Sequence, residues 1–173
     1  LFVIPSLTKG RPRNPFTGVG YLSAFLTANS IANDVIDMNL GCSLSALFRK
    51  IQEFNPDLIG FFLMTRNYKN NYKIINELKS KLNIDIVIGG PHVSTMRKAV
   101  LERCLADYAI KLEGEYTLKD LISGEETENI PGLIYRHGEN IIENEDREFI
   151  ANLDSIPFPT YDKFELKKYY GNS

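Results

Sequence analysis

The chain has 173 residues, of which 43% are hydrophobic and 24% charged, the ordinary composition of a soluble globular domain. A formal net charge of −2 excludes attraction to nucleic acid or to an anionic membrane by bulk charge, and no apolar run is long enough to span a bilayer. The two cysteines, Cys42 and Cys104, form no metal-type cluster, so we expect core residues in a reducing compartment, the cytoplasm. Because the chain starts with Leu and ends in YYGNS, we also expect a fragment of a longer protein.

Strand-like and helix-like segments alternate along the first 125 residues. The run LIGFFLM is nearly all apolar, as in a central parallel strand that is covered on both faces. Apolar residues at helical spacing predict a helix after each strand, and Ser43 is the expected N-cap of the second helix. In chain order, strands are expected at 1–4, 34–39, 58–64, 84–88 and 107–111, and helices at 19–28, 43–54, around 72–82, around 96–104 and within 114–124.

Five strand–helix units in about 125 residues predict an α/β fold, namely a flavodoxin-like (Rossmann-like) five-stranded parallel sheet with helices on both faces. Gly132–Arg136 and Asn140–Asn144 then flank HGE and predict a β-hairpin. The prolines of LDSIPFPTYD favour an extended connector. We therefore expect an α/β domain over 1–125, a hairpin extension over 126–150, and a linker over 151–173 toward a domain outside this sequence.

Ligands of open parallel sheets bind at the C-terminal ends of the strands. Four segments should meet there: the loop 6–18 and the turns 64–67, 89–92 and 112–115. The loop has about 13 residues where such loops usually have about two to six, which favours a functional role. Gly89 and Gly90 would let the backbone approach a bulky ligand closely, although a tight turn without a ligand explains them equally well.

The polar residues at this edge each have a structural and a functional interpretation. We expect His92 to be a helix cap or a surface residue, and His137 to be solvated at the hairpin turn. Thr65 either caps the following helix or touches a ligand. Glu113 and Glu115 either complement a helix dipole or bind amide groups of a cofactor.

Motifs for catalysis and for other cofactors are absent from the sequence. There is no Ser/His/Asp set, no metal-ligand spacing, no Walker loop and no Gly-x-Gly-x-x-Gly. The acids of a response regulator are missing, since the first strand ends in Pro5-Ser6 and the third in Met64-Thr65. The loop SLTKGRPRNPFTG lacks the compact Ser/Thr-Gly arrangement that binds a flavin phosphate.

The chain contains, in this order, NPFTGVGYLSAFLTAN, VIDMN, NPDLIGF, IVIGGPHVST, DYAIKLEGEYTLKDLISG, IPGLIYRHGENII and LDSIPFPTYD. This series resembles the N-terminal half of cobalamin-dependent radical S-adenosylmethionine proteins over nearly the whole chain. The resemblance implies that cobalamin lies across the C-terminal edge of the sheet, with its nucleotide tail beside the strands. It also implies a following barrel with a 4Fe-4S cluster on Cys-x-x-x-Cys-x-x-Cys, which cleaves S-adenosylmethionine and often serves methyl transfer.

The same resemblance implies a set of cofactor-binding residues at the strand ends, none of them catalytic. They are Thr17, Gly18, Gly20, Met64, Thr65, Gly89, Gly90, Pro91, Glu113, Gly114 and Glu115. Gly89 and Gly90 would admit the tail, and Thr65 would hydrogen-bond to it. Glu113 and Glu115 would meet amide groups on the corrin.

Two departures from the family pattern leave alternatives open. The first loop lacks the His of Asp-x-His-x-x-Gly, which ligates cobalt in many other cobalamin domains, and Leu112 stands where the family usually has Gly. We first expect a cobalamin-binding module, itself not catalytic, of a radical enzyme such as a methyltransferase. Its partners would be its own C-terminal barrel and an unidentified small-molecule substrate. One alternative is a domain that has lost the cofactor and serves substrate gating or docking, in which bulky side chains would fill the space above Gly89 and Gly90. Another is a flavin or nucleotide binder.

Overall fold

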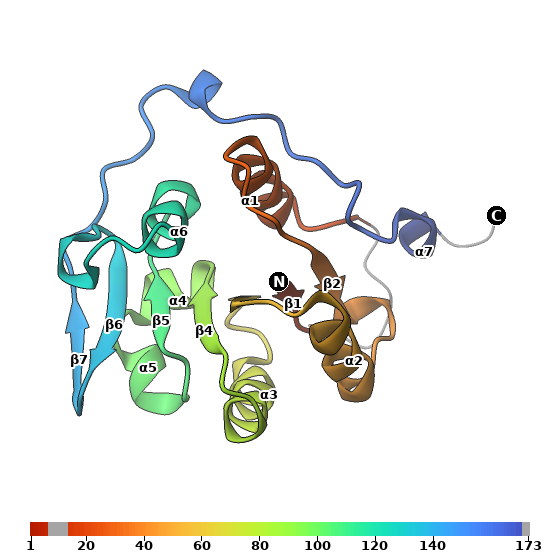
Figure 1. Cartoon of the computed structure of the whole chain (residues 1–173), viewed down its shortest axis with the longest axis horizontal. Helices are drawn as coiled ribbons and strands as arrows, with labels where there is room; N and C mark the ends of the chain where they lie inside the picture. The colour runs from red at the N-terminus through yellow and green to blue at the C-terminus, as the bar shows by residue number, and fades with distance from the viewer. Residues whose placement is uncertain (7–13, 171–173) are drawn as a thin grey trace.

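The computed structural model describes residues 1–6 and 14–170 and contains one mixed sheet with the strand order β2-β1-β3-β4-β5-β6-β7 (Figure 1). The first five strands run parallel, in the order 2-1-3-4-5 that is typical of flavodoxin-like folds. The strands are β1 (Phe2–Ile4), β2 (Val35–Asp37), β3 (Leu58–Phe62), β4 (Asp85–Gly89), β5 (Tyr108–Ile110), β6 (Leu133–His137) and β7 (Asn140–Glu143).

Helices cover both faces of the sheet, as expected. One face is covered by α1 and α6, and the other by α2 to α5 (Figure 1). The helices are α1 (Thr17–Ala28), α2 (Leu44–Phe54), α3 (Tyr68–Lys81), α4 (Pro91–Met96), α5 (Ala99–Arg103), α6 (Glu115–Ile122) and α7 (Leu166–Tyr170). In residues 1–6 and 14–170, no helix is long and apolar enough to cross a membrane.

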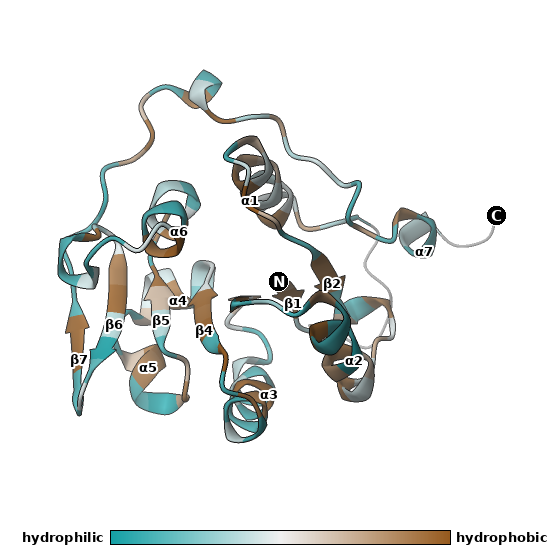
Figure 2. Ribbon diagram, in the orientation of Figure 1, coloured by the Kyte–Doolittle hydropathy of each residue, from teal (hydrophilic) through white to brown (hydrophobic). Residues whose placement is uncertain are grey.

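Successive side chains of each strand point to opposite faces of the sheet and so belong to two separate cores. In β4, Ile86 and Ile88 join the core under α2 to α5, whereas Val87 joins the core under α1 and α6. Both faces of the central strands are therefore apolar, which explains their continuous hydrophobic runs (Figure 2). The candidate site described below lies in the layer of α1 and α6.

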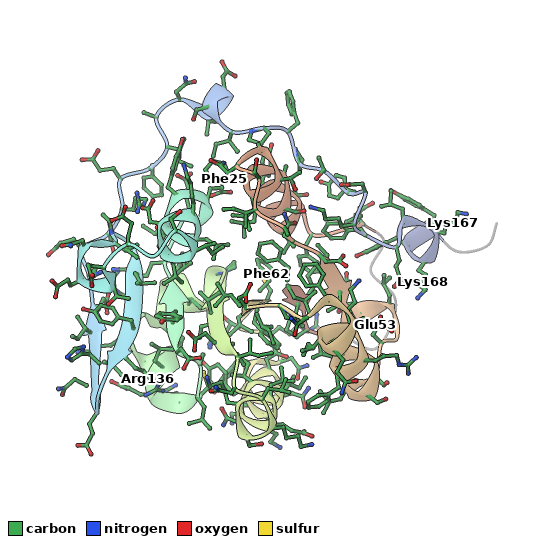
Figure 3. All side chains as sticks on the ribbon, viewed as in Figure 1. Phe25, Glu53, Phe62, Arg136, Lys167 and Lys168 are labelled. Carbon is green, nitrogen blue, oxygen red and sulfur yellow. The ribbon has the colours of Figure 1, made fainter. Side chains whose placement is uncertain are left out.

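The sheet has seven strands, so the expectation of five was wrong. The predicted hairpin forms, but its β6 pairs antiparallel with β5, with Tyr135 opposite Tyr108, and so extends the same sheet. Without β6 the outer edge of β5 would expose unpaired backbone groups. Arg136, labelled in Figure 3, fastens the hairpin by donating from Nε to Ala106 O at 3.0 Å and from Nη2 to Cys104 O at 2.7 Å.

Three further predictions can be compared with the structure. Ser43 is the N-cap of α2, because its side chain accepts a hydrogen bond from Ala46 N. The single helix expected around 96–104 is broken into α4 and α5 at Arg97, whose φ of 53° interrupts helical geometry. His92 is neither a surface residue nor a cap. It is 1% exposed, and its Nε2 lies 2.8 Å from Tyr72 Oη.

Residues 151–170, called the C-terminal strap here, run over the outside of α6 and α1 to the β2 edge of the sheet (Figure 1). Thr160 N donates to Gly20 O at 3.3 Å, and Tyr169 Oη donates to the buried Asp37 Oδ2 at 2.6 Å. Lys163 Nζ adds hydrogen bonds to two further side chains near the end of α1. The segment predicted as a linker is thus packed on this domain, and its role in reaching another domain stays a prediction.

Candidate functional site

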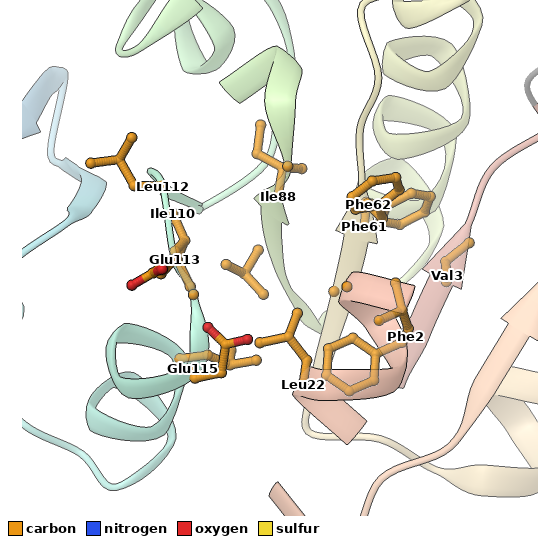
Figure 4. A pocket seen from close by; sticks show the side chains of 18 residues that line it. Phe2, Val3, Leu22, Phe61, Phe62, Ile88, Ile110, Leu112, Glu113 and Glu115 are labelled. Atoms are coloured by element: carbon orange, nitrogen blue, oxygen red, sulfur yellow. The ribbon is translucent and has the colours of Figure 1, made fainter. Parts of the chain in front are cut away.

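A cavity of about 270 Å³ lies between α1 and α6, above β1, β3 and β4, at the C-terminal edge of the sheet (Figure 4). Ile110 of β5 lies on one side of the cavity and Phe62 of β3 on the other (Figure 4). The ring of Phe25 in α1 meets the ring of Tyr116, in the first turn of α6, edge to face, with centroids 5.1 Å apart. The two helices therefore contact each other beside the cavity.

The cavity exists because the sequence places glycines where side chains would otherwise fill it. Gly60 of β3 and Gly89 of β4 share the register of Leu58, Phe62 and Val87, the residues that face α1 and α6. A Cβ on Gly89 would meet only Ile110 O, at 3.8 Å, and a Cβ on Gly18 would meet nothing within 4 Å. Backbone is thus accessible on two sides of the cavity, as a bulky ligand requires.

Gly90 has a different role from Gly89. Its φ of 102° lies in the region that favours glycine, and a Cβ there would stand 2.9 Å from Leu63 O and 3.0 Å from the Phe62 ring. The chain path itself therefore requires Gly90. The space above Gly89 is open, in contrast to the filled space expected of a domain that has lost its cofactor.

The rim of the cavity, where α6 begins, carries the two carboxyl groups of Glu113 and Glu115 (Figure 4). Burial raises the pKa of Glu115, and the charge of Glu113 adds to the effect. Glu113 Oε2 accepts a hydrogen bond from Ile150 N at 2.7 Å, so the chain leading into the strap holds this side chain in place. Within residues 1–6 and 14–170, the other lining residues are glycines or have apolar side chains.

The opposite rim is the first turn of α1. No side chain in the described part of the chain caps this helix, and the first turn has no acidic residue. The first N–H groups of a helix have no partner within it, and the helix dipole makes them attractive to anions. Gly18 lies in this turn and lines the cavity, so backbone N–H groups border one side and carboxyl groups the other.

Lys111 and Leu112 fix the turn that leads into the rim. Leu112 has a φ of 57°, the region that favours glycine, and its N donates to Ser94 Oγ at 2.9 Å. The Lys111 side chain is fully buried and binds Glu143 Oε1 at 3.3 Å and the Asp146 carboxylate. Leu112 thus adopts a left-handed conformation beside the buried Lys111, whose acidic partners are partly exposed.

The structure brings together six of the eleven residues implied by the resemblance. Those lining the cavity are Gly18, Gly89, Gly90, Glu113, Gly114 and Glu115. Thr17 is exposed next to it, Gly20 packs under the strap, and Met64 follows β3 outside the lining. Thr65 and Pro91 are exposed, and Thr65 Oγ1 lies 3.3 Å from His92 Nδ1 instead. Of the long loop 6–18, residues 7–13 lie outside the described residues.

The sequence reasoning missed the apolar part of the cavity. Phe2, Leu22, Gly60, Phe62 and Leu118 line it, and none was singled out. One signal was available: Gly60 interrupts an otherwise apolar strand at a position that faces the α1 side, where an isolated glycine indicates close approach of another group.

The two histidines lie away from the cavity. His92 is buried in the layer of α3 and α4, where burial lowers its pKa and its ring stacks on Tyr68 with centroids 4.9 Å apart. His137 ends β6. Among the described residues, no group of three or more His, Cys, Asp or Glu side chains could hold a metal ion.

Residues 14–122 match the family model of the B12 binding domain. The chain is 28% identical over 161 residues to uncharacterized methyltransferase PH0819 of Pyrococcus horikoshii, covering 90% of this chain and 35% of that protein. It is 25% identical over 163 residues to 4′-phospho-dehydrooxetanocin synthase of Priestia megaterium, covering 88% of this chain and 22% of the relative. The chain thus spans about a third or less of the length of these relatives.

Two solved structures share the fold. The cobalamin-dependent S-adenosylmethionine radical enzyme OxsB with aqua-cobalamin bound superposes with a TM-score of 0.84, at 23% identity, over 97% of this chain and 25% of that one. The radical S-adenosylmethionine methyltransferase TsrM of Kitasatospora setae, with cobalamin and a [4Fe-4S] cluster bound, gives 0.72 at 20% identity over 91% of this chain and 30% of that one.

Proposed function

The chain belongs to the B12 binding domain family, and from this we propose that it is the cobalamin-binding module of a longer radical S-adenosylmethionine enzyme that transfers methyl groups. The observation that carries the proposal is the glycine-lined cavity at the C-terminal edge of the sheet. The iron–sulfur cluster, S-adenosylmethionine and the substrate would bind in a further domain. Support for that part comes from relatives about three to four times as long as this chain, two of them named methyltransferases.

The residues of the cavity fit cobalamin in size and in chemistry. Gly18 and Gly89 leave free space beside their backbones, so a rigid ring system can enter between α1 and α6. The cavity would hold the nucleotide tail, while the corrin would lie across its mouth. When bound, cobalamin supplies a cobalt centre that can accept a methyl group and pass it on.

The two sides of the rim suit different parts of the cofactor. The N–H groups of the first turn of α1, near Gly18, are placed to bind the phosphodiester of the tail. Glu113 and Glu115 are placed to accept hydrogen bonds from the amide groups around the corrin.

No histidine reaches the cavity, so this domain would give the lower face of cobalt no imidazole. The tail, once inserted beside the strands, could not coordinate cobalt either. We therefore expect the bound cofactor to have its tail displaced and its lower cobalt face free of nitrogen ligands.

Titration of the purified chain with hydroxocobalamin, followed by visible spectroscopy, tests the proposal. We expect saturable binding, and loss of binding in Gly18→Leu, whose side chain would fill open space without straining the helix. Asn70→Leu, an exposed position in the first turn of α3, is the matched control and should bind like the parent chain. Absence of binding at ~100 µM, a free energy of roughly −5.5 kcal/mol, would contradict the proposal.

A further inference from the structure

The cavity is polar at its rim and apolar at its inner end. Its inner end, called the floor here, consists of Phe2, Gly60, Val87 and Leu118. The same four residues also border a second cavity of about 230 Å³ that lies toward the opposite edge of the sheet. The Phe2 ring closes the floor, since its Cδ1 lies 3.3 Å from where a Cβ on Gly60 would stand.

The floor offers a ligand little hydrogen-bonding capacity. Its side chains are hydrocarbon, and its backbone donors are engaged in the fold. Phe2 N donates to Asp34 O at 2.8 Å, Gly60 N donates to Leu1 O at 2.8 Å, and Leu118 N donates to Gly114 O at 2.8 Å. A polar group that reached the floor would lose its water without gaining a partner.

The two carboxyl groups of the rim lie at the start of α6. Glu115 begins α6, and Leu118 lies almost one helical turn farther along it. Glu113 precedes the helix and is already bound by Ile150 N. Among the described residues, Glu113 and Glu115 are the only polar side chains of the lining, and neither belongs to the floor.

Resting on the proposed function, we propose that this cavity selects among cobamides by the base at the end of the tail. A benzimidazole or a phenolic ring is accepted, because its buried surface is almost wholly hydrocarbon. An adenine base is rejected, because its exocyclic amine and several ring nitrogens would be buried without partners, and leaving such groups unpaired is costly. Phe2, Val87 and Leu118 are the residues that set this specificity.

The affinities of four corrinoids for the 173-residue chain test the proposal: cobalamin, a phenolyl cobamide, an adeninyl cobamide and cobinamide, which has no nucleotide tail. The phenolyl and adeninyl forms are compared first, because a phenolic tail has no nitrogen that must leave cobalt. We expect the adeninyl form to bind at least ~10-fold more weakly than the phenolyl form, equivalent to ~1.4 kcal/mol. Cobinamide should also bind more weakly than cobalamin.

A matched pair of variants locates the selection at the floor. Val87→Thr keeps the side-chain shape and adds a hydroxyl at the floor, so the preference for the phenolyl over the adeninyl form should narrow. Val100→Thr makes the same change at a buried position under the opposite face, and should leave the preference unchanged.

The outcomes separate this inference from the proposed function. Equal affinity for the phenolyl and adeninyl forms, or cobinamide binding as tightly as cobalamin, would overturn the inference while leaving cobalamin binding in place. An unchanged preference in Val87→Thr would overturn the assignment to the floor. Failure of all four corrinoids to bind would overturn both.

Discussion

Lys111→Met is expected to destabilise the domain by removing the buried cation beside the rim of the cavity. The Lys111 side chain is 0% exposed and binds Glu143, Asp146 and, at 2.7 Å, the backbone O of Asn144. Removing one partner of a fully buried pair costs about 3 to 5 kcal/mol. Here both acids keep the half-exposed Arg97 as a partner, so we expect a smaller loss of about 2 kcal/mol.

For a chain of this length, a loss of about 2 kcal/mol corresponds to a fall in melting temperature of roughly 4 to 8 °C, measurable by circular dichroism. Lys81→Met is the control, because the Lys81–Glu77 pair is exposed and should contribute under about 1 kcal/mol. A melting temperature for Lys111→Met equal to that of the parent chain would refute the account of this cluster.

The same cluster predicts how the effect depends on pH. Hydrogen bonds from Arg97 and Lys111 lower the pKa of Asp146 to about 2. Burial raises the pKa of Glu143, but hydrogen bonds from the same two cations outweigh it and lower the pKa overall. A lowered folded-state pKa stabilises the fold above the unfolded pKa, and this contribution is lost as pH falls through the folded value. The stability lost in Lys111→Met should therefore reach its maximum above about pH 5 and decrease toward pH 2. A loss of stability that stays constant over this pH range would contradict the prediction.

Three further predictions concern the strap and the rim. Tyr169→Phe removes the 2.6 Å hydrogen bond to the buried Asp37 and should cost about 1.5 to 3 kcal/mol in urea unfolding; no loss would show that the strap is not docked there. Leu112→Gly should raise the free energy of unfolding by about 0.5 kcal/mol in the same assay. The left-handed backbone at this position is strained for leucine, and the relief of that strain exceeds the entropic cost of glycine. A clearly lower free energy of unfolding would contradict this prediction. Gly20→Ala should make the strap more sensitive to proteolysis, because the new Cβ would stand 2.9 Å from the ring of Tyr161 in the strap. Gly18→Ala is the control and should leave the sensitivity to proteolysis unchanged, because its Cβ would meet nothing within 4 Å.

Much of the parallel sheet could be predicted from the sequence, because its signals are local. The apolar run of β3 and the capping residue Ser43 each reflect neighbouring residues alone. The glycines at the end of β4 likewise pointed to the edge of the sheet where the structure has the cavity. The distinction between Gly89, which opens the cavity, and Gly90, which the chain path requires, depends on backbone angles and on Phe62, and so needed the structure.

The features that were missed depend on contacts between distant residues. The prolines after Asp154 predict an extended chain, but nothing local indicates that this chain packs on Gly20 and ends with Tyr169 on Asp37. The hairpin was expected, yet its pairing with β5 depends on an edge that forms only when the sheet does. His92 was predicted as a cap or surface residue but is buried, because its partner Tyr72 is 20 residues away in sequence.

Electron paramagnetic resonance of the chain loaded with cobalamin in the Co(II) state can test whether the tail lies between α1 and α6, because an axial nitrogen ligand splits the cobalt lines. With the tail in the glycine-lined cavity and no histidine lining that cavity, we expect a spectrum without nitrogen splitting. Splitting by one axial nitrogen would mean that the tail base or a histidine still holds cobalt, and would contradict the placement of the tail between α1 and α6.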